Sequence, residues 1–180
     1  MLDHFALLAD YNRWMNGNLH RSAAALPAAD LAAPRGAFFG SILGTFNHLV
    51  VADTIWLKRF AGNDESGRWS ALRPLAGVPM PERLDAQPCA DLAQWWARRQ
   101  ALDATIVDWI AQLDADDPSR TLHYGNMRGE PHRKRLSHLL LHLFNHQTHH
   151  RGQATTLFSQ CGVDVGATDL LLRIPAADPG

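Results

Sequence analysis

The histidines near the end of the chain are the residues in this sequence best placed to do chemistry. The chain has ten histidines, and five of them fall in one short window: His138, His142, His146, His149 and His150. Residues four apart on an α-helix lie one turn apart and about 40° around its axis, so two imidazoles at this spacing can direct ring nitrogens toward one point. The spacing of His138, His142, His146 and His150 therefore favours metal binding.

A metal ion needs at least one more ligand from another element, because one helix face cannot surround it. His48 is the only histidine in the central part of another expected helix. It lies in a largely apolar segment, where an unpaired imidazole would be costly to bury. His48, His146 and His150 are therefore the candidate ligands. Three imidazoles from two helices would leave coordination positions open, which is typical of catalytic sites.

Spacing alone leaves other interpretations of these histidines open. A buried histidine is commonly a hydrogen-bonded core residue, and a histidine-rich helix can be a solvated face. Helical bundles also hold haem between histidines on opposing helices. We expect His149 to point away from the others. His138 and His142 remain open as outer-shell, substrate-facing or merely polar residues.

The elements that position these histidines are expected to be four helices. Apolar residues recur at spacings of three and four, and Asp3 and Ser41 are candidate N-caps. The expected helices span residues 3–26, 41–60, 89–116 and 137–161. Four amphipathic helices of similar length bury their apolar faces most simply as an all-α four-helix bundle, in one domain over residues 1–180.

Glycine and proline mark the connections. Residues 62–88 are rich in both, which predicts a long crossover loop between the second and third helices. Residues 121–135 read either as a small β-hairpin or as an irregular excursion. Trp69 lies in the long loop, where it could cover a pocket. The five other tryptophans are expected to pack the bundle or a dimer seam.

Composition excludes several classes of function. The net charge of −1 gives no long-range field for nucleic acid, and we interpret the basic run of residues 132–135 as a solvated face. No stretch approaches the length of a transmembrane helix. The N-terminus lacks the pattern of a signal peptide, so a cytoplasmic location is expected. Two cysteines are too few for a disulfide framework.

Three strings of residues carry a resemblance to a known family. They are residues 142–153 (HLFNHQTHHRGQ), 47–53 (NHLVVAD) and 11–16 (YNRWMN). With the approach to the last helix, they resemble the DinB/YfiT-like family of metal-binding four-helix bundles over nearly the whole chain. The resemblance implies His48, His146 and His150 as ligands of a divalent ion, with zinc or nickel favoured. It also implies a homodimer packed through helices.

The leading functional hypothesis is a metal-dependent enzyme that activates a small thiol or water for attack on an electrophilic small molecule. It draws on the resemblance, because that family includes transferases and isomerases that use small cellular thiols such as bacillithiol or mycothiol. The alternative is a non-catalytic metal-binding or stress-associated protein. Gln147 follows His146, so the HExxH pattern of metalloproteases is missing.

Two further residues beside the expected ligands have open roles. Arg151 could bind an anionic group, although a helix-surface or capping arginine is the simpler interpretation. Gln153 could orient a ligand, or could make an ordinary helix hydrogen bond.

Overall fold

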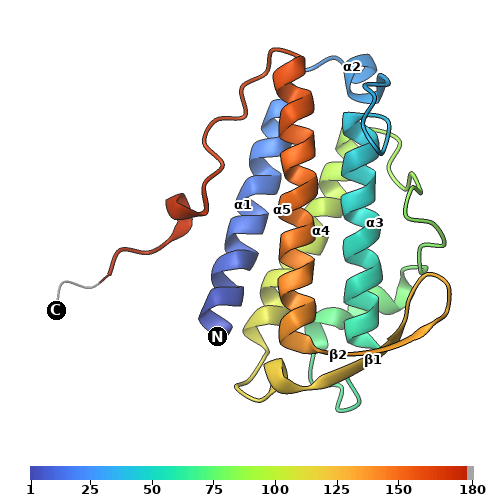
Figure 1. The fold of residues 1–180 in the computed structure, drawn as a ribbon, viewed down its shortest axis with the longest axis vertical. Helices are drawn as coiled ribbons and strands as arrows, with labels where there is room; N and C mark the ends of the chain where they lie inside the picture. The colour runs from blue at the N-terminus through green and yellow to red at the C-terminus, as the bar shows by residue number, and fades with distance from the viewer. Residues whose placement is uncertain (178–180) are drawn as a thin grey trace.

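The computed structural model describes residues 1–177, which fold mainly into a bundle of long helices (Figure 1). Within these residues the four long helices are α1 (Leu2–Ala24), α3 (Ile42–Ala61), α4 (Leu92–Ala111) and α5 (Leu136–Gln160). Helix α5 packs against α1 on one side and α3 on the other, and α4 packs against both α1 and α3. The predicted all-α four-helix bundle is confirmed.

Two of the four long helices, α3 and α4, begin at residues whose side chains cap them. Ser41 accepts a hydrogen bond from the backbone N–H of Gly44 at 3.0 Å, so the predicted N-cap of α3 is confirmed. Asp91 caps α4 in the same way, through the N–H of Gln94 at 2.8 Å. The first helix starts at Leu2, so Asp3 lies inside its first turn. There its carboxylate is favourable to the helix dipole without being the N-cap.

Helix α3 is buried on nearly all sides, with 15 of its 20 residues buried. Its inner face carries Phe46, whose ring stacks on Trp95 of α4 at 4.1 Å. One end carries Phe60, stacked on Trp109 at 4.8 Å. Its outer face is covered by the chain between α3 and α4. This burial holds the backbone of α3 in place, and with it His48 near the middle of the helix.

The connection between α3 and α4 is the predicted long crossover, and it includes the 3₁₀ helix η1 (Ser70–Gly77). Trp69 is buried, 1% exposed, with its ring 5.5 Å from that of Trp109. It does line a cavity of about 270 Å³ beside Lys58 and Leu72, but none of the three clustered histidines lines that cavity. A short helix, α2 (Ala28–Ala32), was not predicted.

Residues 121–135 form a β-hairpin, which settles the choice left open by the sequence. Strands β1 (Thr121–Gly125) and β2 (Pro131–Arg135) pair antiparallel, with Leu122 opposite Lys134. Leu122 is 2% exposed, so the face of the hairpin that carries it packs toward the bundle. The hairpin runs along one end of the bundle directly before α5 (Figure 1).

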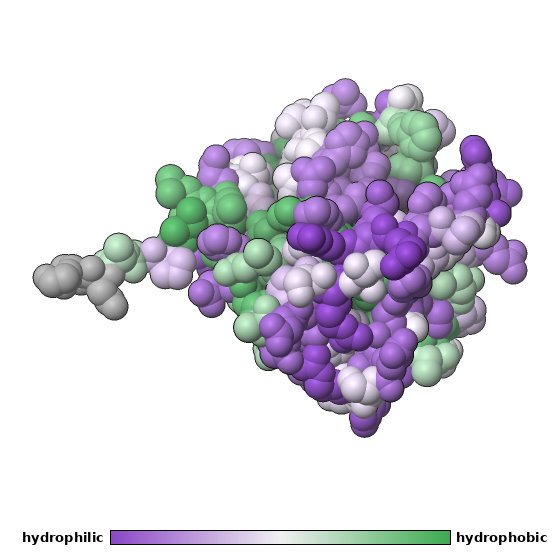
Figure 2. Space-filling model, turned by 60° about the horizontal axis from the view of Figure 1, so that its bottom comes forward, coloured by the Kyte–Doolittle hydropathy of each residue, from purple (hydrophilic) through white to green (hydrophobic). Residues whose placement is uncertain are grey.

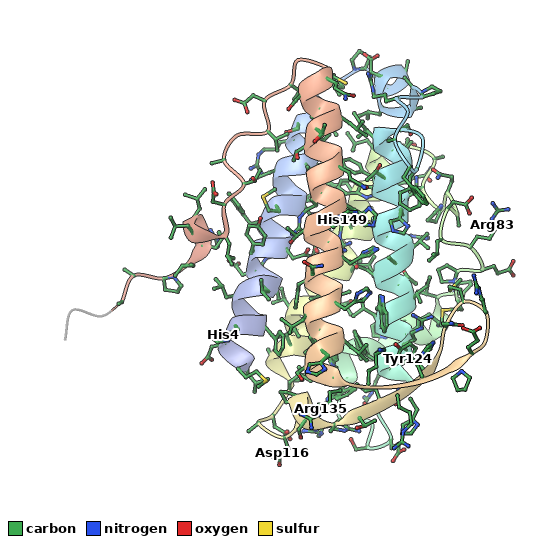
Figure 3. The ribbon with its side chains drawn as sticks, in the orientation of Figure 1. His4, Arg83, Asp116, Tyr124, Arg135 and His149 are labelled. Carbon is green, nitrogen blue, oxygen red and sulfur yellow. The ribbon has the colours of Figure 1, made fainter. Side chains whose placement is uncertain are left out.

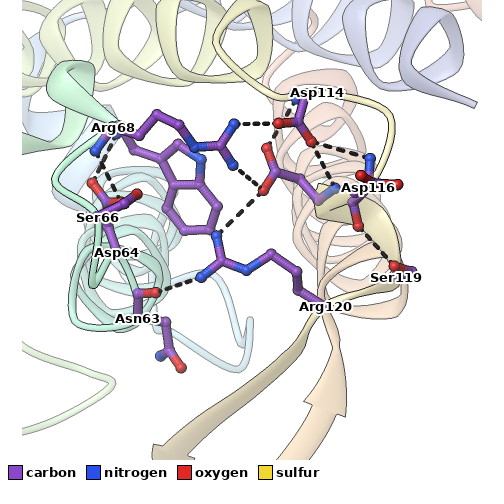
Figure 4. A network of polar contacts seen from close by, with 10 residues as sticks. Asn63, Asp64, Ser66, Arg68, Asp114, Asp116, Ser119 and Arg120 are labelled. Carbon is purple, nitrogen blue, oxygen red and sulfur yellow. Dashed lines mark hydrogen bonds and ion pairs between the residues drawn. The ribbon is translucent and has the colours of Figure 1, made fainter.

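A polar network ties the connections together at this end of the bundle (Figure 4). Arg68 and Arg120 both pair with the carboxylate of Asp117, at 2.5 and 3.3 Å. Arg120 also donates to the backbone carbonyl of Asn63 at 3.1 Å. The network thereby joins the segment after α3 to the turn that precedes the hairpin.

The surface is mostly hydrophilic at the end seen in Figure 2, and apolar side chains gather near the C-terminal segment. That segment contains the 3₁₀ helix η3 (Leu170–Arg173). It is held to α1 by Tyr11, which donates to the carbonyl of Thr168 at 2.6 Å. In the described part of the chain, no helix has the length and apolar character needed to cross a bilayer.

Candidate metal centre

The fold brings His48, His146 and His150 together at the seam between α3 and α5. One ring nitrogen from each lies within 4.8 Å of the others. The Nε2 atoms of His48 and His146 are 3.1 Å apart, and the His150 ring centroid is 4.4 Å from those of both other rings. The expectation that these three histidines lie close together is therefore met by the structure.

Two hydrogen bonds fix the tautomers of His48 and His150. The Nδ1 atom of His48 lies 2.9 Å from the carbonyl oxygen of Leu84. Because a carbonyl only accepts, Nδ1 must carry the proton. The Nδ1 atom of His150 donates in the same way to Gln153 Oε1 at 2.8 Å. In both rings the Nε2 lone pair is then free to bind an ion, the arrangement that partner groups around metal sites impose on histidine ligands.

The three imidazoles favour the neutral form, which is the form that binds metal. Burial lowers the pKa of His48 and of His150. Burial, followed by the charges of the neighbouring histidines, lowers the pKa of His146 to about 3. The cluster is therefore held as three neutral nitrogen donors at ordinary pH.

Phe39 covers part of the cluster. Its ring stacks on His48 with centroids 3.8 Å apart and meets His150 edge-on at 5.5 Å. It comes from the turn before α3, where Gly40 has φ +79°, a conformation that favours glycine. We did not predict this role. The available signal was an aromatic residue followed by Gly40 and the N-cap Ser41.

The donor set fits a divalent ion. Three neutral imidazole nitrogens suit several such ions, zinc, nickel, copper and iron among them. Among the described residues the cluster contains no carboxylate or thiol ligand in addition to the three histidines. Such a site keeps at least one coordination position for an exogenous ligand, unlike the closed four-ligand sites that serve structural roles.

The remaining histidines of α5 lie outside the cluster. His149 is exposed on the outer face of α5 (Figure 3), as expected. His138 is also exposed. His142 lies one turn before His146, with its ring 5.8 Å from that of His146. Burial, then the charges of Arg59 and Lys134, lower the pKa of His142.

Both interpretations of Arg151 are wrong. It is neither a surface residue nor an open anion site, because it is 3% exposed and faces α1. There it donates to the side chain of Asn12 and lies 5.3 Å from the Tyr11 ring. Burial lowers its pKa to about 10. Gln153, in contrast, does orient a candidate ligand, because its Oε1 accepts from Nδ1 of His150.

A helical bundle with three neutral histidines at one seam defines a class of candidate metal-binding bundles. The model of the DinB family matches residues 1–179, and the chain belongs to the DinB family. It is similar to Protein DinB of Bacillus subtilis (strain 168), with 24% identity over 169 residues, which cover 94% of this chain and 92% of that protein. No solved structure matches the chain.

Proposed function

We propose that this chain binds one divalent metal ion through His48, His146 and His150 and uses it to activate a small thiol or a water molecule. The activated group would attack an electrophilic small molecule, as in a thiol S-transferase. The observation that carries the proposal is the convergence of three ring nitrogens within 4.8 Å. Zinc and nickel are the preferred ions because the family resemblance favours them; imidazole ligands by themselves suit copper and iron equally well.

The residues around the cluster would have separate roles: some would orient the histidine rings, and one would shield the site from water. Leu84 and Gln153 hold the rings of His48 and His150 with Nε2 toward the shared point. Phe39 shields one face of His48 from water, and exclusion of water strengthens electrostatic interactions inside a site. When bound, a divalent ion would supply the positive charge that lowers the pKa of a thiol or water toward neutrality.

Metal content is the first test. The untagged protein, analysed by plasma mass spectrometry after loading with zinc or nickel, should retain about one ion per chain. His48→Ala and His150→Ala should each lose it. His138→Ala is the matched control, because His138 is an exposed histidine of the same helix that lies outside the cluster and should leave the content unchanged. A wild-type protein that holds no ion after loading would contradict the proposal.

A measurement of turnover distinguishes a metal-dependent enzyme from a non-catalytic metal-binding protein. The metal-loaded protein should accelerate the reaction of glutathione with 1-chloro-2,4-dinitrobenzene, used as probes, and His48→Ala should abolish the acceleration. The alternative is a non-catalytic metal-binding protein, favoured by the lack of a carboxylate in the described cluster that could act as a general base. It predicts an ion that raises thermal stability, with no acceleration for any thiol or electrophile.

We also propose that the chain forms a homodimer, as the family resemblance implies. The apolar side chains exposed on the C-terminal segment, Leu171 at 73% and Leu172 at 55%, support an association of this kind because contiguous apolar surface commonly marks an interface. Light scattering on the purified chain should give twice the monomer mass. A monomer mass over the whole accessible concentration range would contradict it.

A further inference from the structure

A groove lies next to the histidine cluster, between the end of α3, the hairpin and the first turns of α5. Its volume is about 540 Å³, which is within the range of small-molecule sites. Its walls include Trp56 of α3, Tyr124 of β1 and His142 of α5. Figure 3 shows Tyr124 beside the end of α3. The proposed metal centre does not account for this groove.

The groove is positively charged. Arg133, Lys134 and Arg135 all contribute to its lining, and none of the described residues that line it is Asp or Glu. The pairing of Leu122 with Lys134 places the Lys134 side chain on the face of the hairpin that packs toward the bundle, because side chains alternate along a strand. Lys134 thus faces the groove side of the hairpin.

Arg59 adds a further cation beside the aromatic wall, although its side chain lines the neighbouring groove and not this one. Its guanidinium lies 4.7 Å from the Trp56 ring centroid and 5.1 Å from that of Tyr124. In the part of the chain that the structure describes, neither Arg59 nor Lys134 forms an ion pair with a carboxylate. Aromatic faces stabilise a cation but do not neutralise it. The charge therefore remains available to an anion.

Aromatic side chains connect the wall of the groove to the cluster. The Trp56 ring lies 5.0 Å from that of His142, and the His142 ring lies 5.8 Å from that of His146. A rise of four residues along α5 is about 6 Å. His142 at the wall of the groove is therefore about one helical turn from His146, a step that a small molecule can span.

We propose that this groove binds the acidic group, a carboxylate in the first instance, of the small molecule that reacts at the histidine cluster. Lys134 and Arg59 supply the charge, and Trp56 and Tyr124 supply a flat apolar wall. The assignment of this ligand as the substrate rests on the proposed function. Binding of the anion in the groove is independent of the proposed function, since it uses none of the three histidines.

Phthalate, a planar dicarboxylate, is a suitable probe, with phthalamide as its neutral counterpart. Binding to the full chain is followed by NMR, through the imidazole shifts of His138 and His142. Phthalate should bind more tightly than phthalamide. Lys134→Gln and Arg59→Gln should each weaken phthalate binding on the order of fivefold, which corresponds to about 1 kcal/mol. Arg128→Gln is the matched control, because it removes one positive charge from the exposed turn of the same hairpin.

The outcomes separate the two proposals. Equal binding of phthalate and phthalamide, or equal loss in Lys134→Gln and Arg128→Gln, would overturn the groove assignment even if the ion is retained. Preferential binding of a single-stranded oligonucleotide, lost in Lys134→Gln, would also overturn it in favour of nucleic acid. Phthalate binding in a protein that holds no ion would support the anion site and overturn only the proposed metal function.

Discussion

Gln153 has a direct influence on the proposed metal centre although it is not one of the candidate ligands. It lies one turn after His150, and its Oε1 accepts from His150 Nδ1 at 2.8 Å. The same side chain approaches the exposed ring of His149 at 3.2 Å. Without this acceptor His150 could rotate or take the other tautomer, which would turn its lone pair away from the cluster.

We predict that Gln153→Ala weakens zinc binding by roughly tenfold or more, the usual effect of removing a residue that orients a metal ligand. Thermal unfolding of the metal-free protein should be unchanged, because Gln153 is only partly buried. Zinc affinity is measured by competition with a chelator dye. Gln153→Glu, which keeps an acceptor oxygen, should restore binding, and Gln160→Ala at the exposed end of α5 is the control. Undiminished affinity in Gln153→Ala would refute the positioning role.

At the scale of residues, the sequence could predict the three histidines and could offer Gln153 as an orienting residue, but it could not predict what orients His48. The spacing of His146 and His150 follows from helix geometry, and His48 stands out in an apolar helix. The Leu84 carbonyl has no sequence signal, because every residue has one. Arg151 was misinterpreted because adjacent helix positions lie about 100° apart: His150 faces α3, whereas Arg151 faces α1.

At the scale of elements, Asn47 fastens the long crossover loop where it approaches the cluster. Its Nδ2 donates to the carbonyl of Cys89 at 3.0 Å and to Gln87 Oε1 at 3.0 Å. Its Oδ1 accepts from the N–H of Cys89 at 2.8 Å. Since Leu84 lies in the same loop, this attachment also holds the carbonyl that orients His48.

We predict that Asn47→Ala lowers the free energy of unfolding by about 1–3 kcal/mol, because the buried backbone groups of Cys89 lose their partner. The loop over residues 78–89 should become more accessible to hydrogen exchange, and zinc affinity should fall with it. Asn63→Ala is the matched control: Asn63 fastens the hairpin at the other end of α3, through His123. In Asn63→Ala, hydrogen exchange should increase at the hairpin and stay unchanged in the loop over residues 78–89.

The prediction of elements succeeded where periodicity was long and failed where it was short. The four long helices show repeated apolar spacing, so their existence and approximate bounds followed from the sequence. Helix α2 has only five residues, too few to display a period. The hairpin remained one of two alternatives because its strands are five residues each, and β2 is largely basic and exposed. Its pairing depends on packing of Leu122 against the bundle.

At the scale of the whole molecule, the four long helices share a polar network in the bundle interior. Arg99 of α4 is fully buried and pairs with Asp53 of α3 at 2.6 Å and with Asp103 at 3.1 Å. Asp103 also accepts from Asn16 of α1 at 2.9 Å. Arg151 of α5 joins the network through its contact with Asn12. The sequence did not reveal this network, because its members are dispersed among ordinary helix positions.

We predict that Arg99→Leu lowers the free energy of unfolding by about 3–5 kcal/mol, since removing one partner of a buried ion pair leaves the other charges uncompensated. Urea denaturation monitored by circular dichroism gives the measurement. Arg13→Gln is the control: it removes an arginine whose pair with Asp10 is exposed, and it should leave stability nearly unchanged. Similar losses in the two variants would show that the buried pair contributes no more than a surface pair.

The Arg99→Leu variant should regain part of its lost free energy of unfolding in mild acid. Burial raises the pKa of Asp103 even with Arg99 beside it, and removal of Arg99 should raise it further. In Arg99→Leu the folded state then binds a proton more tightly than the unfolded state, so the free energy of unfolding rises as the pH falls from that raised pKa toward the unfolded value of about 3.9. The gap between the variant and the wild type should therefore narrow between neutral pH and about pH 5. A gap that stays constant or widens over this range would show that Asp53 and Asp103 are not the charges left uncompensated.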